Sequence, residues 1–184
     1  MVDNLPDSIK VGTITVAVGG ASIDLFNKRT YKAYLKKQPA WMKNFASGYN
    51  GNPYARLIEL AKIAQKQGVI KGILLHQGET DNGSPTWAAR VNTVYHDILK
   101  DLNLKAENVP LLVGETVQKD QGGSCWAHIA VVDSIAKTIP TAHVISSKGC
   151  PQRGDGLHFV AESYRIMGRR YADMMLSLLG IKFD

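Results

Sequence analysis

The chain has 184 residues, 45% of them apolar and 21% charged, which is the composition of a globular protein that we treat as a single domain over residues 1–184. No apolar run approaches the roughly 20 residues that span a bilayer, so we expect no membrane partner. The net charge of +6 comes from dispersed Lys and Arg rather than a basic stripe interleaved with aromatic residues, which argues against a nucleic-acid partner. Residues 1–10 contain no apolar signal-peptide core and are typical of a linker.

Short apolar runs alternate with longer amphipathic ones along the chain. We expect four strands, at residues 13–18, 69–75, 110–113 and 142–145. We expect four helices, at residues 53–67, 85–102, 124–138 and 159–179, with Ser124 as the N-cap of the third. This alternation predicts a parallel sheet with helices on both of its faces. Residues 21–52 are rich in aromatic side chains without clear periodicity, so we expect a functional loop there.

Three polar or glycine-rich segments follow predicted strands. They are residues 19–22, residues 76–81 and, after the last strand, residues 154–159. In a sheet of this class, functional sites form outside the carboxyl ends of the strands. The sequence therefore predicts that the three segments lie on one rim of the molecule.

Asp155 and His158 are three residues apart in a glycine-containing loop that leads into the last helix. An Asp that accepts a hydrogen bond from one imidazole nitrogen fixes the tautomer and leaves the other nitrogen free to take a proton from a nucleophile. The same spacing also fits an N-capping Asp beside a surface His. A metal site formed with His76 is a third interpretation, but the spacing is not diagnostic of one.

The polar run that follows the second predicted strand contains a further set of candidates. A series of polar groups directly after an apolar strand is costly unless it serves a site or a closed hydrogen-bond network. Gln77 can offer a side-chain N–H to a developing oxyanion, and Gly20 can offer a backbone N–H. Glu79 either orients this loop or is an acidic residue at a helix N-terminus, and His76 fits a packed or hydrogen-bonded residue better than a second base.

The sequences AVGGAS (17–22), HQGETD (76–81) and DGLHF (155–159), in this order, resemble those of the SGNH hydrolase superfamily. Within it they are most similar to carbohydrate acetylesterases, which include acetyl xylan esterases and sialate O-acetylesterase-like proteins. The resemblance implies a three-layer α/β/α, flavodoxin-like fold and no metal or cofactor. It also implies hydrolysis of acetyl esters on plant polysaccharide or other sugars through an acyl-enzyme.

The same resemblance assigns roles to the candidate residues. It implies that His158 is the general base, that Asp155 orients it, and that Gly20 and the Gln77 loop form the oxyanion site. Glu79 and His76 would then help to position these groups without contacting the substrate themselves. The expected partner is an acetylated carbohydrate.

The chain departs from the family in having no serine motif of the G-Q-S-N or G-D-S type upstream of the glycine pair. Residues 13–18 match the family's second strand, so we expect the first, central strand and the nucleophile upstream of this chain, supplied by an N-terminal segment or by a second copy. Ser22 is an alternative nucleophile, although it lacks the second glycine of an elbow motif. The other functions that we consider are a non-catalytic carbohydrate-binding pseudo-enzyme and a lipase or thioesterase of the same fold, which would need an apolar channel.

Two cysteines and three tryptophans complete the set of candidates. We expect Cys125 and Cys150 on the same rim, either as two buried thiols or as a disulfide, and a disulfide would favour a secreted or periplasmic protein. The tryptophans, Trp41, Trp87 and Trp126, are either sugar-stacking platforms or core residues.

Overall fold

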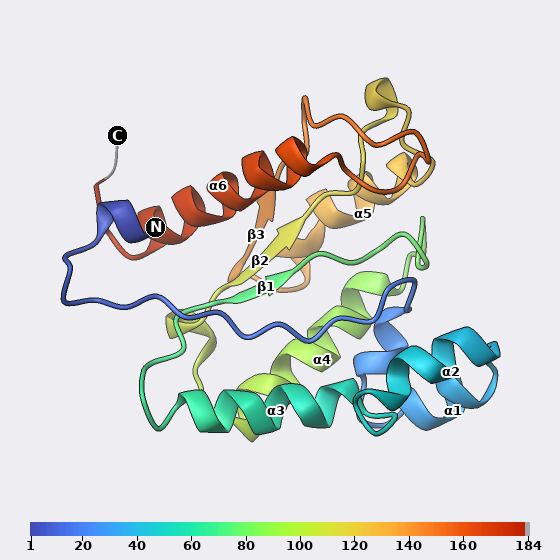
Figure 1. The fold of residues 1–184 in the computed structure, drawn as a ribbon, viewed down its shortest axis with the longest axis horizontal. Helices are drawn as coiled ribbons and strands as arrows, with labels where there is room; N and C mark the ends of the chain where they lie inside the picture. Colours follow the sequence, from blue (N-terminus) through green and yellow to red (C-terminus); the bar gives the residue numbers. More distant parts are fainter. Residues whose placement is uncertain (183–184) are drawn as a thin grey trace.

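The computed structural model of the chain describes residues 1–182 and contains a parallel sheet between layers of helices (Figure 1). The strands β1 (Ile73–Leu75), β2 (Leu111–Gly114) and β3 (Ala142–Ile145) lie in the order β1-β2-β3. Both pairings are parallel, with Leu74 opposite Leu112 and Leu112 opposite His143. The predicted α/β/α fold class is therefore confirmed.

The two faces of the sheet are covered by different helices. The helices α3 (Pro53–Ala64), α4 (Trp87–Asp101) and α5 (Ile129–Asp133) pack on one face, and α6 (Ala161–Leu178) packs on the other. Successive side chains of a strand point to opposite faces, so Leu111 and Val113 of β2 join the α3–α5 core while Leu112 joins the α6 core. All four residues of β2 are buried because helices cover it on both sides.

Most helices begin and end near the predicted positions. Asn52 caps α3, its Oδ1 accepting the N–H of Ala55 at 3.0 Å, and Pro53 occupies the first helical position, where a missing N–H costs nothing. The helix expected at residues 124–138 is instead broken into η5 (Trp126–His128), α5 and η6 (Ile135–Lys137). Ser124 does not cap it, and its N–H donates to the carbonyl of Gly156 instead.

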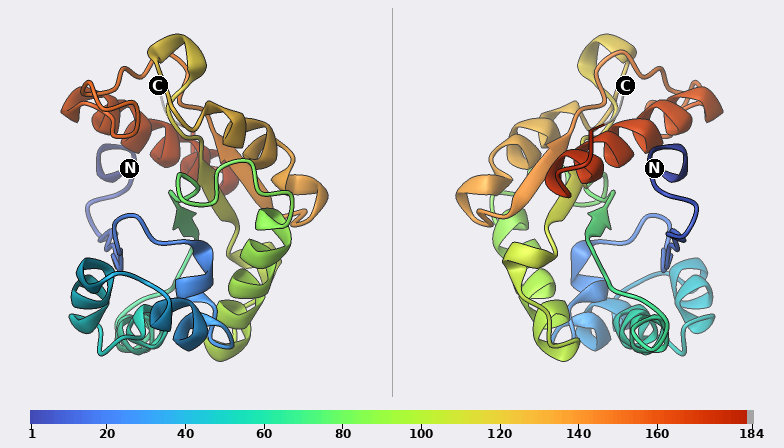
Figure 2. Two further views of the ribbon diagram at one scale, coloured as in Figure 1. Left: turned by 90° about the vertical axis from the view of Figure 1, so that its right-hand side faces the viewer. Right: turned by 90° about the vertical axis from the view of Figure 1, so that its left-hand side faces the viewer.

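The strand predicted at residues 13–18 does not form. This stretch is extended and mostly exposed, with no strand paired to it in the part of the chain that the structure describes. It passes in front of β1 in Figure 1 but lies apart from that strand in Figure 2, and it does not join the sheet. Strand β1 is accordingly an edge strand, and Leu74 is 56% exposed although its register partner Leu112 is fully buried. The prediction was wrong because β-branched residues form a strand only where a neighbouring strand supplies hydrogen bonds.

Residues 21–52 are mostly helical, which corrects the prediction of a loop. They contain η2 (Ile23–Phe26), α1 (Tyr31–Lys36) and α2 (Ala40–Ser47), which pack around a small core of their own. The remaining short helices are η1 (Val2–Asn4), η3 (Ala106–Asn108) and η4 (Lys119–Gln121).

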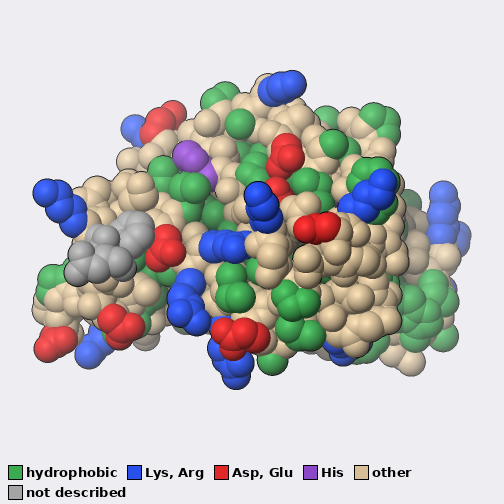
Figure 3. Space-filling model, turned by 90° about the horizontal axis from the view of Figure 1, so that it is seen from above, with side chains coloured by type: hydrophobic (Ala, Val, Ile, Leu, Met, Phe, Trp, Pro, Cys, Tyr) green, Lys and Arg blue, Asp and Glu red, His purple; other side chains and the backbone are tan. Residues whose placement is uncertain are grey.

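The surface over α6 carries basic and acidic side chains interspersed with apolar ones (Figure 3). Within residues 1–182, no helix combines the length and the hydropathy that a membrane span requires.

Candidate active site

The loops that follow the strands lie together on one side of the molecule, which faces the viewer in the left-hand view of Figure 2. They comprise residues 76–86 after β1, residues 115–125 after β2 and residues 146–160 after β3. The turn at Gly19–Gly20 is tied to the first of these loops, because the hydroxyl of Thr80 donates to the carbonyl of Gly20 at 2.7 Å. The sequence-predicted candidates are therefore carried by neighbouring segments of one rim.

Asp155 holds the His158 ring through a compact local turn. Its Oδ1 accepts the backbone N–H groups of Leu157 and His158 at 2.9 and 2.8 Å. Its Oδ2 lies 2.8 Å from His158 Nδ1. Gly154 and Gly156 have positive φ angles of 105° and 73°, which lets the chain turn this tightly. The geometry fixes the imidazole through Nδ1, and the 55% exposed His158 side chain has no hydrogen-bond partner at Nε2 among the described residues.

Arg153 is a third member of this turn that sequence reasoning missed. Its Nε donates to Asp155 Oδ2 at 2.8 Å, and its Nη2 lies 3.4 Å from His158 Nδ1. The backbone N–H of His158, the guanidinium of Arg153 and the N–H of Leu157 hold the pKa of Asp155 well below its ordinary value. Asp155 is therefore a stable anion beside the imidazole.

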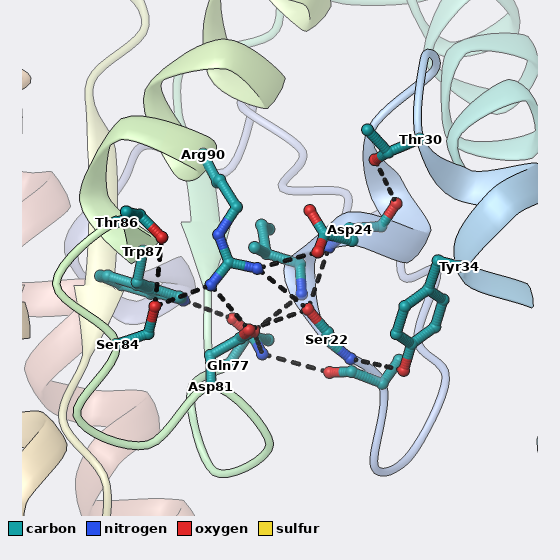
Figure 4. Close-up of polar contacts among 12 residues, drawn as sticks. Ser22, Asp24, Thr30, Tyr34, Gln77, Asp81, Ser84, Thr86, Trp87 and Arg90 are labelled. Carbon is teal, nitrogen blue, oxygen red and sulfur yellow. Dashed lines mark hydrogen bonds and ion pairs between the residues drawn. The ribbon is translucent and has the colours of Figure 1, made fainter. Parts of the chain in front are cut away.

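A second carboxylate, Asp81, is the centre of a buried network (Figure 4). Its Oδ1 accepts from Ser22 Oγ at 2.8 Å and pairs with Arg90 Nη2 at 2.9 Å. Its Oδ2 accepts from the N–H of Ile23 at 2.9 Å and from Gln77 Nε2 at 2.7 Å. Burial alone would raise the pKa of Asp81, but these hydrogen bonds and the charge of Arg90 outweigh it and lower the pKa. Asp81 is the last residue of the HQGETD segment, but the sequence assigned it no role, and no pattern in the sequence pointed to Arg90.

The Gln77 side chain is fully engaged in this network. Its Nε2 donates to the carbonyl of Ala21 at 3.1 Å as well as to Asp81, and its Oε1 accepts from Trp87 Nε1 at 2.7 Å. Both amide hydrogens are therefore in use, and Gln77 fastens the glycine turn to the loop after β1. The oxyanion role that we predicted for Gln77 stays a prediction and would require its amide to exchange a partner. In contrast, the backbone N–H of Gly20 has no partner among the described residues.

The alternative nucleophile, Ser22, has a different local role. It is buried, donates to Asp81 and accepts the N–H of Asp24 at 3.3 Å, which caps the short helix η2. Arg90 Nη1 also lies 3.3 Å from its hydroxyl oxygen. These contacts engage the Ser22 hydroxyl in the network. They explain the presence of a serine at this position without any role as a nucleophile.

Among the described residues, no hydrogen bond or ion pair joins His76 or Glu79 to Asp155 or His158. The His76 ring lies edge to face with Phe159, with centroids 5.8 Å apart, and packs over Gly114 of β2. The backbone carbonyl of Glu79 accepts a weak hydrogen bond from Cys125 Sγ at 3.6 Å. The supporting roles predicted for both residues stay predictions.

His128 is a fully buried histidine that the sequence did not single out. Its ring lies edge to face with Trp87 at 4.6 Å and against Gly78, where any Cβ would overlap it. Neither ring nitrogen has a hydrogen-bond partner among the described residues. Burial lowers the pKa of His128, opposed by the charges of Asp81 and Glu79, so the ring packs as a neutral group.

A buried carboxylate, Glu115, connects the loops after β2 and β3. Its Oε2 accepts from the N–H of Ser147 at 2.6 Å, from the hydroxyl of Ser146 at 3.1 Å and from Gln118 Nε2 at 2.7 Å. The chain continues from Ser147 to the Asp155–His158 turn only a few residues later. Glu115 therefore anchors the base of the loop that carries this turn.

The predicted disulfide is absent, because Cys125 and Cys150 are both free and buried. The two thiols have different surroundings: Cys125 lies against the carbonyl of Glu79, whereas Cys150 lies in the α6 core, 3.5 Å from Arg170. The secreted or periplasmic location, which depended on that disulfide, stays a prediction.

A parallel α/β/α sheet with an Asp–His pair at its rim is typical of the SGNH class of hydrolases. The family described as carbohydrate esterase, sialic acid-specific acetylesterase, matches residues 1–177, and the chain belongs to that family. A solved structure of a protein from Arabidopsis thaliana is similar in fold, with a TM-score of 0.59 and 19% sequence identity. The similarity covers 86% of this chain and 57% of the Arabidopsis chain, so the present chain spans little more than half of that protein.

Proposed function

We propose that this protein is a carbohydrate O-acetylesterase that uses Ser–His–Asp chemistry, with its serine on polypeptide outside residues 1–184. Family membership supports esterase activity on carbohydrate. The observation that carries the mechanism is the 2.8 Å contact between Asp155 and His158 Nδ1, together with a free Nε2 on an exposed ring. This arrangement leaves one nitrogen ready to accept a proton from a hydroxyl.

In the proposed reaction, His158 Nε2 takes the proton of the serine hydroxyl as its oxygen attacks the acetyl carbonyl. Asp155 stabilises the imidazolium that results, because it stays ionised beside Nδ1. The N–H of Gly20 is the group that we assign to the oxyanion. His158 then gives the proton to the sugar oxygen as its bond to the acetyl carbon breaks, and a sugar hydroxyl leaves. In the second half, His158 takes a proton from the water that attacks the acetyl-enzyme and returns it to the serine oxygen as acetate departs.

The free edge of β1 supports a serine supplied from outside residues 1–184. Strand β1 is paired on one side only, and its Leu74 side chain is exposed. An edge strand presents backbone N–H and C=O groups with which a further strand can pair. A strand entering there would deliver the residue at its carboxyl end to the rim, next to the loop that follows β1. We propose a preceding segment of the same protein as its source, with a second copy as the alternative.

A non-catalytic carbohydrate-binding protein is the second candidate, and one observation favours it. Among the described residues, no hydroxyl or thiol is hydrogen-bonded to His158 Nε2, and both amide hydrogens of Gln77 are committed elsewhere. Such a protein would bind acetylated glycans without releasing acetate.

Acetate release distinguishes the two candidates. We expect the longest polypeptide that the gene encodes to hydrolyse acetylated xylo-oligosaccharide and p-nitrophenyl acetate, and His158→Ala to lower kcat by about 10⁴-fold. His96→Ala, which removes an exposed histidine of α4, is the control and should keep the full rate. Full activity in His158→Ala would overturn the mechanism. Binding of the oligosaccharide without any acetate release would favour the non-catalytic protein.

A further inference from the structure

The three tryptophans have different surroundings. Trp87 is fully buried and donates to Gln77, so it belongs to the core. Trp126 is 44% exposed, but Lys119 Nζ lies over its ring, 4.4 Å from the centroid. Trp41 is 51% exposed and has no cation over its ring among the described residues.

Trp41 borders the glycine turn of the candidate active site. Its ring lies so close to Gly20 that a Cβ added to this glycine would be 3.2 Å from the ring edge. Trp41 also contacts Phe45, one helical turn away, with ring centroids 6.2 Å apart at an interplanar angle of 81°. Phe45 is exposed as well, so two aromatic side chains form one surface that begins at Gly20.

The helix under these rings is firmly packed. Met42 of α2 is buried in the small core that α1, α2 and the glycine turn share, and Ala46 is fully buried as well. The Tyr49 hydroxyl, just beyond α2, donates to the carbonyl of Ala17 at 3.2 Å. An aromatic surface on such a support is in place before a ligand arrives, which lowers the entropic cost of binding.

We propose that Trp41 and Phe45 form a carbohydrate-stacking subsite, which takes a pyranose ring of the acetylated glycan while the ester lies at Gly20. This proposal rests on the proposed function for the nature of the substrate. A pyranose has an apolar face of C–H groups for the aromatic surface and hydroxyls at its edge for polar partners. Thr80, exposed at the same turn, is such a partner, whereas the N–H of Gly20 is assigned to the ester. An acyl chain, by contrast, would offer no hydrogen bond to the Thr80 hydroxyl oxygen.

The test compares a carbohydrate ester with an ester that has no sugar. We expect Trp41→Ala to lower kcat/KM on acetylated xylo-oligosaccharide by about tenfold, mainly through KM, and to lower it on p-nitrophenyl acetate by less than about threefold. Phe45→Ala should act in the same direction, and Trp41→Tyr should restore most of the loss. Trp126→Ala is the matched control, with both substrates hydrolysed as before. Circular dichroism and the urea midpoint check that each variant folds.

A binding arm separates failure of this subsite from failure of the proposed function. In affinity electrophoresis, acetylated xylan should retain the unmodified protein but not Trp41→Ala. This result supports the subsite even if no ester is hydrolysed. Equal kinetic losses on the two esters, or unchanged kinetics and retention in Trp41→Ala, would overturn it. The subsite is also overturned if the unmodified protein is not retained, or if Trp41→Ala abolishes self-association or lipid-vesicle binding instead of glycan binding.

Discussion

Two carboxylates of this protein, Asp81 and Asp155, each accept four hydrogen bonds or ion pairs, but they do so in opposite settings. Asp81 is buried, and its partners come from residues 22, 23, 77 and 90. Asp155 is partly exposed, and its partners all lie between residues 153 and 158. The first carboxylate joins distant segments, whereas the second shapes one turn.

The difference separates a structural group from a group that is available for chemistry. In the Asp81 network, Ser22 and Gln77 donate their polar hydrogens to other atoms of the protein, so none is left to donate to a substrate. Around Asp155, the His158 ring keeps one nitrogen free and exposed. Loss of Asp81 should therefore destabilise the fold, and loss of Asp155 should change the chemistry of His158 while stability is kept.

The largest expected effect is that of Asp81→Ala. It leaves the half-buried Arg90 and the buried Ser22 without their main partner, so we expect a loss of about 3–5 kcal/mol in the free energy of unfolding, measured in urea. Asp24→Ala is the matched control, since Asp24 also pairs with Arg90, at 3.0 Å, but is more exposed. It should cost about 1 kcal/mol or less. Equal losses in the two variants would contradict the central role of Asp81.

Gly78→Ala tests the packing of the same loop. The added Cβ overlaps the buried ring of His128 at a φ of 153°, so we expect a loss of about 2–4 kcal/mol. Gly83→Ala, at a φ of 70° with open space around it, isolates the backbone cost and should lose about 1 kcal/mol. The double variant Gly78→Ala/His128→Ala removes the ring that the added Cβ overlaps. If this double variant is no less stable than Gly78→Ala, the overlap is the cause of the loss.

The pH dependence of unfolding should separate His128 from Asp81. The pKa of His128 is lowered in the folded state, so the unfolded chain takes up this proton more readily and stability falls as pH drops below about 6.5. The pKa of Asp81 is lowered too, so its contribution is complete above about pH 4 and is lost in more acidic solution. Urea titrations from pH 7 to pH 3 should show that His128→Leu reduces the first decline, to which His76 also contributes because burial lowers its pKa. Asp81→Asn should reduce the second decline, to which Asp101 also contributes because its pKa is lowered as well.

The smallest expected change in stability is that of Asp155→Asn. Its partners are exposed and lie within a few residues, so we expect no measurable shift of the urea midpoint. The His158 ring should nevertheless lose its fixed tautomer, which the ¹⁵N chemical shifts of the imidazole report, with His96 as an internal reference. A midpoint shift as large as that of Asp81→Ala would contradict the distinction between the two carboxylates.

The elements that the sequence predicted correctly are those with a complete local pattern. Strand β3 has the predicted bounds, and α4 and α6 lie within two residues of theirs. The failures depended on partners outside the pattern. Residues 13–18 have strand-forming side chains but no neighbouring strand, and Ser124 is held by Gly156 rather than by its helix.

By itself, the sequence determined the class of sheet and the Asp155–His158 turn, because apolar periodicity and a glycine-flanked D-x-x-H both act within a few residues. Only the tertiary structure decided that Ser22 and Gln77 are committed to Asp81, that the two cysteines remain apart, and that Trp41 is the tryptophan beside Gly20. The reason is physical. Apart from the Gln77–Asp81 hydrogen bond, which joins residues four positions apart, these facts depend on which side chains meet across 20 to 60 residues of chain. Burial of polar groups, which no local pattern encodes, selects those contacts.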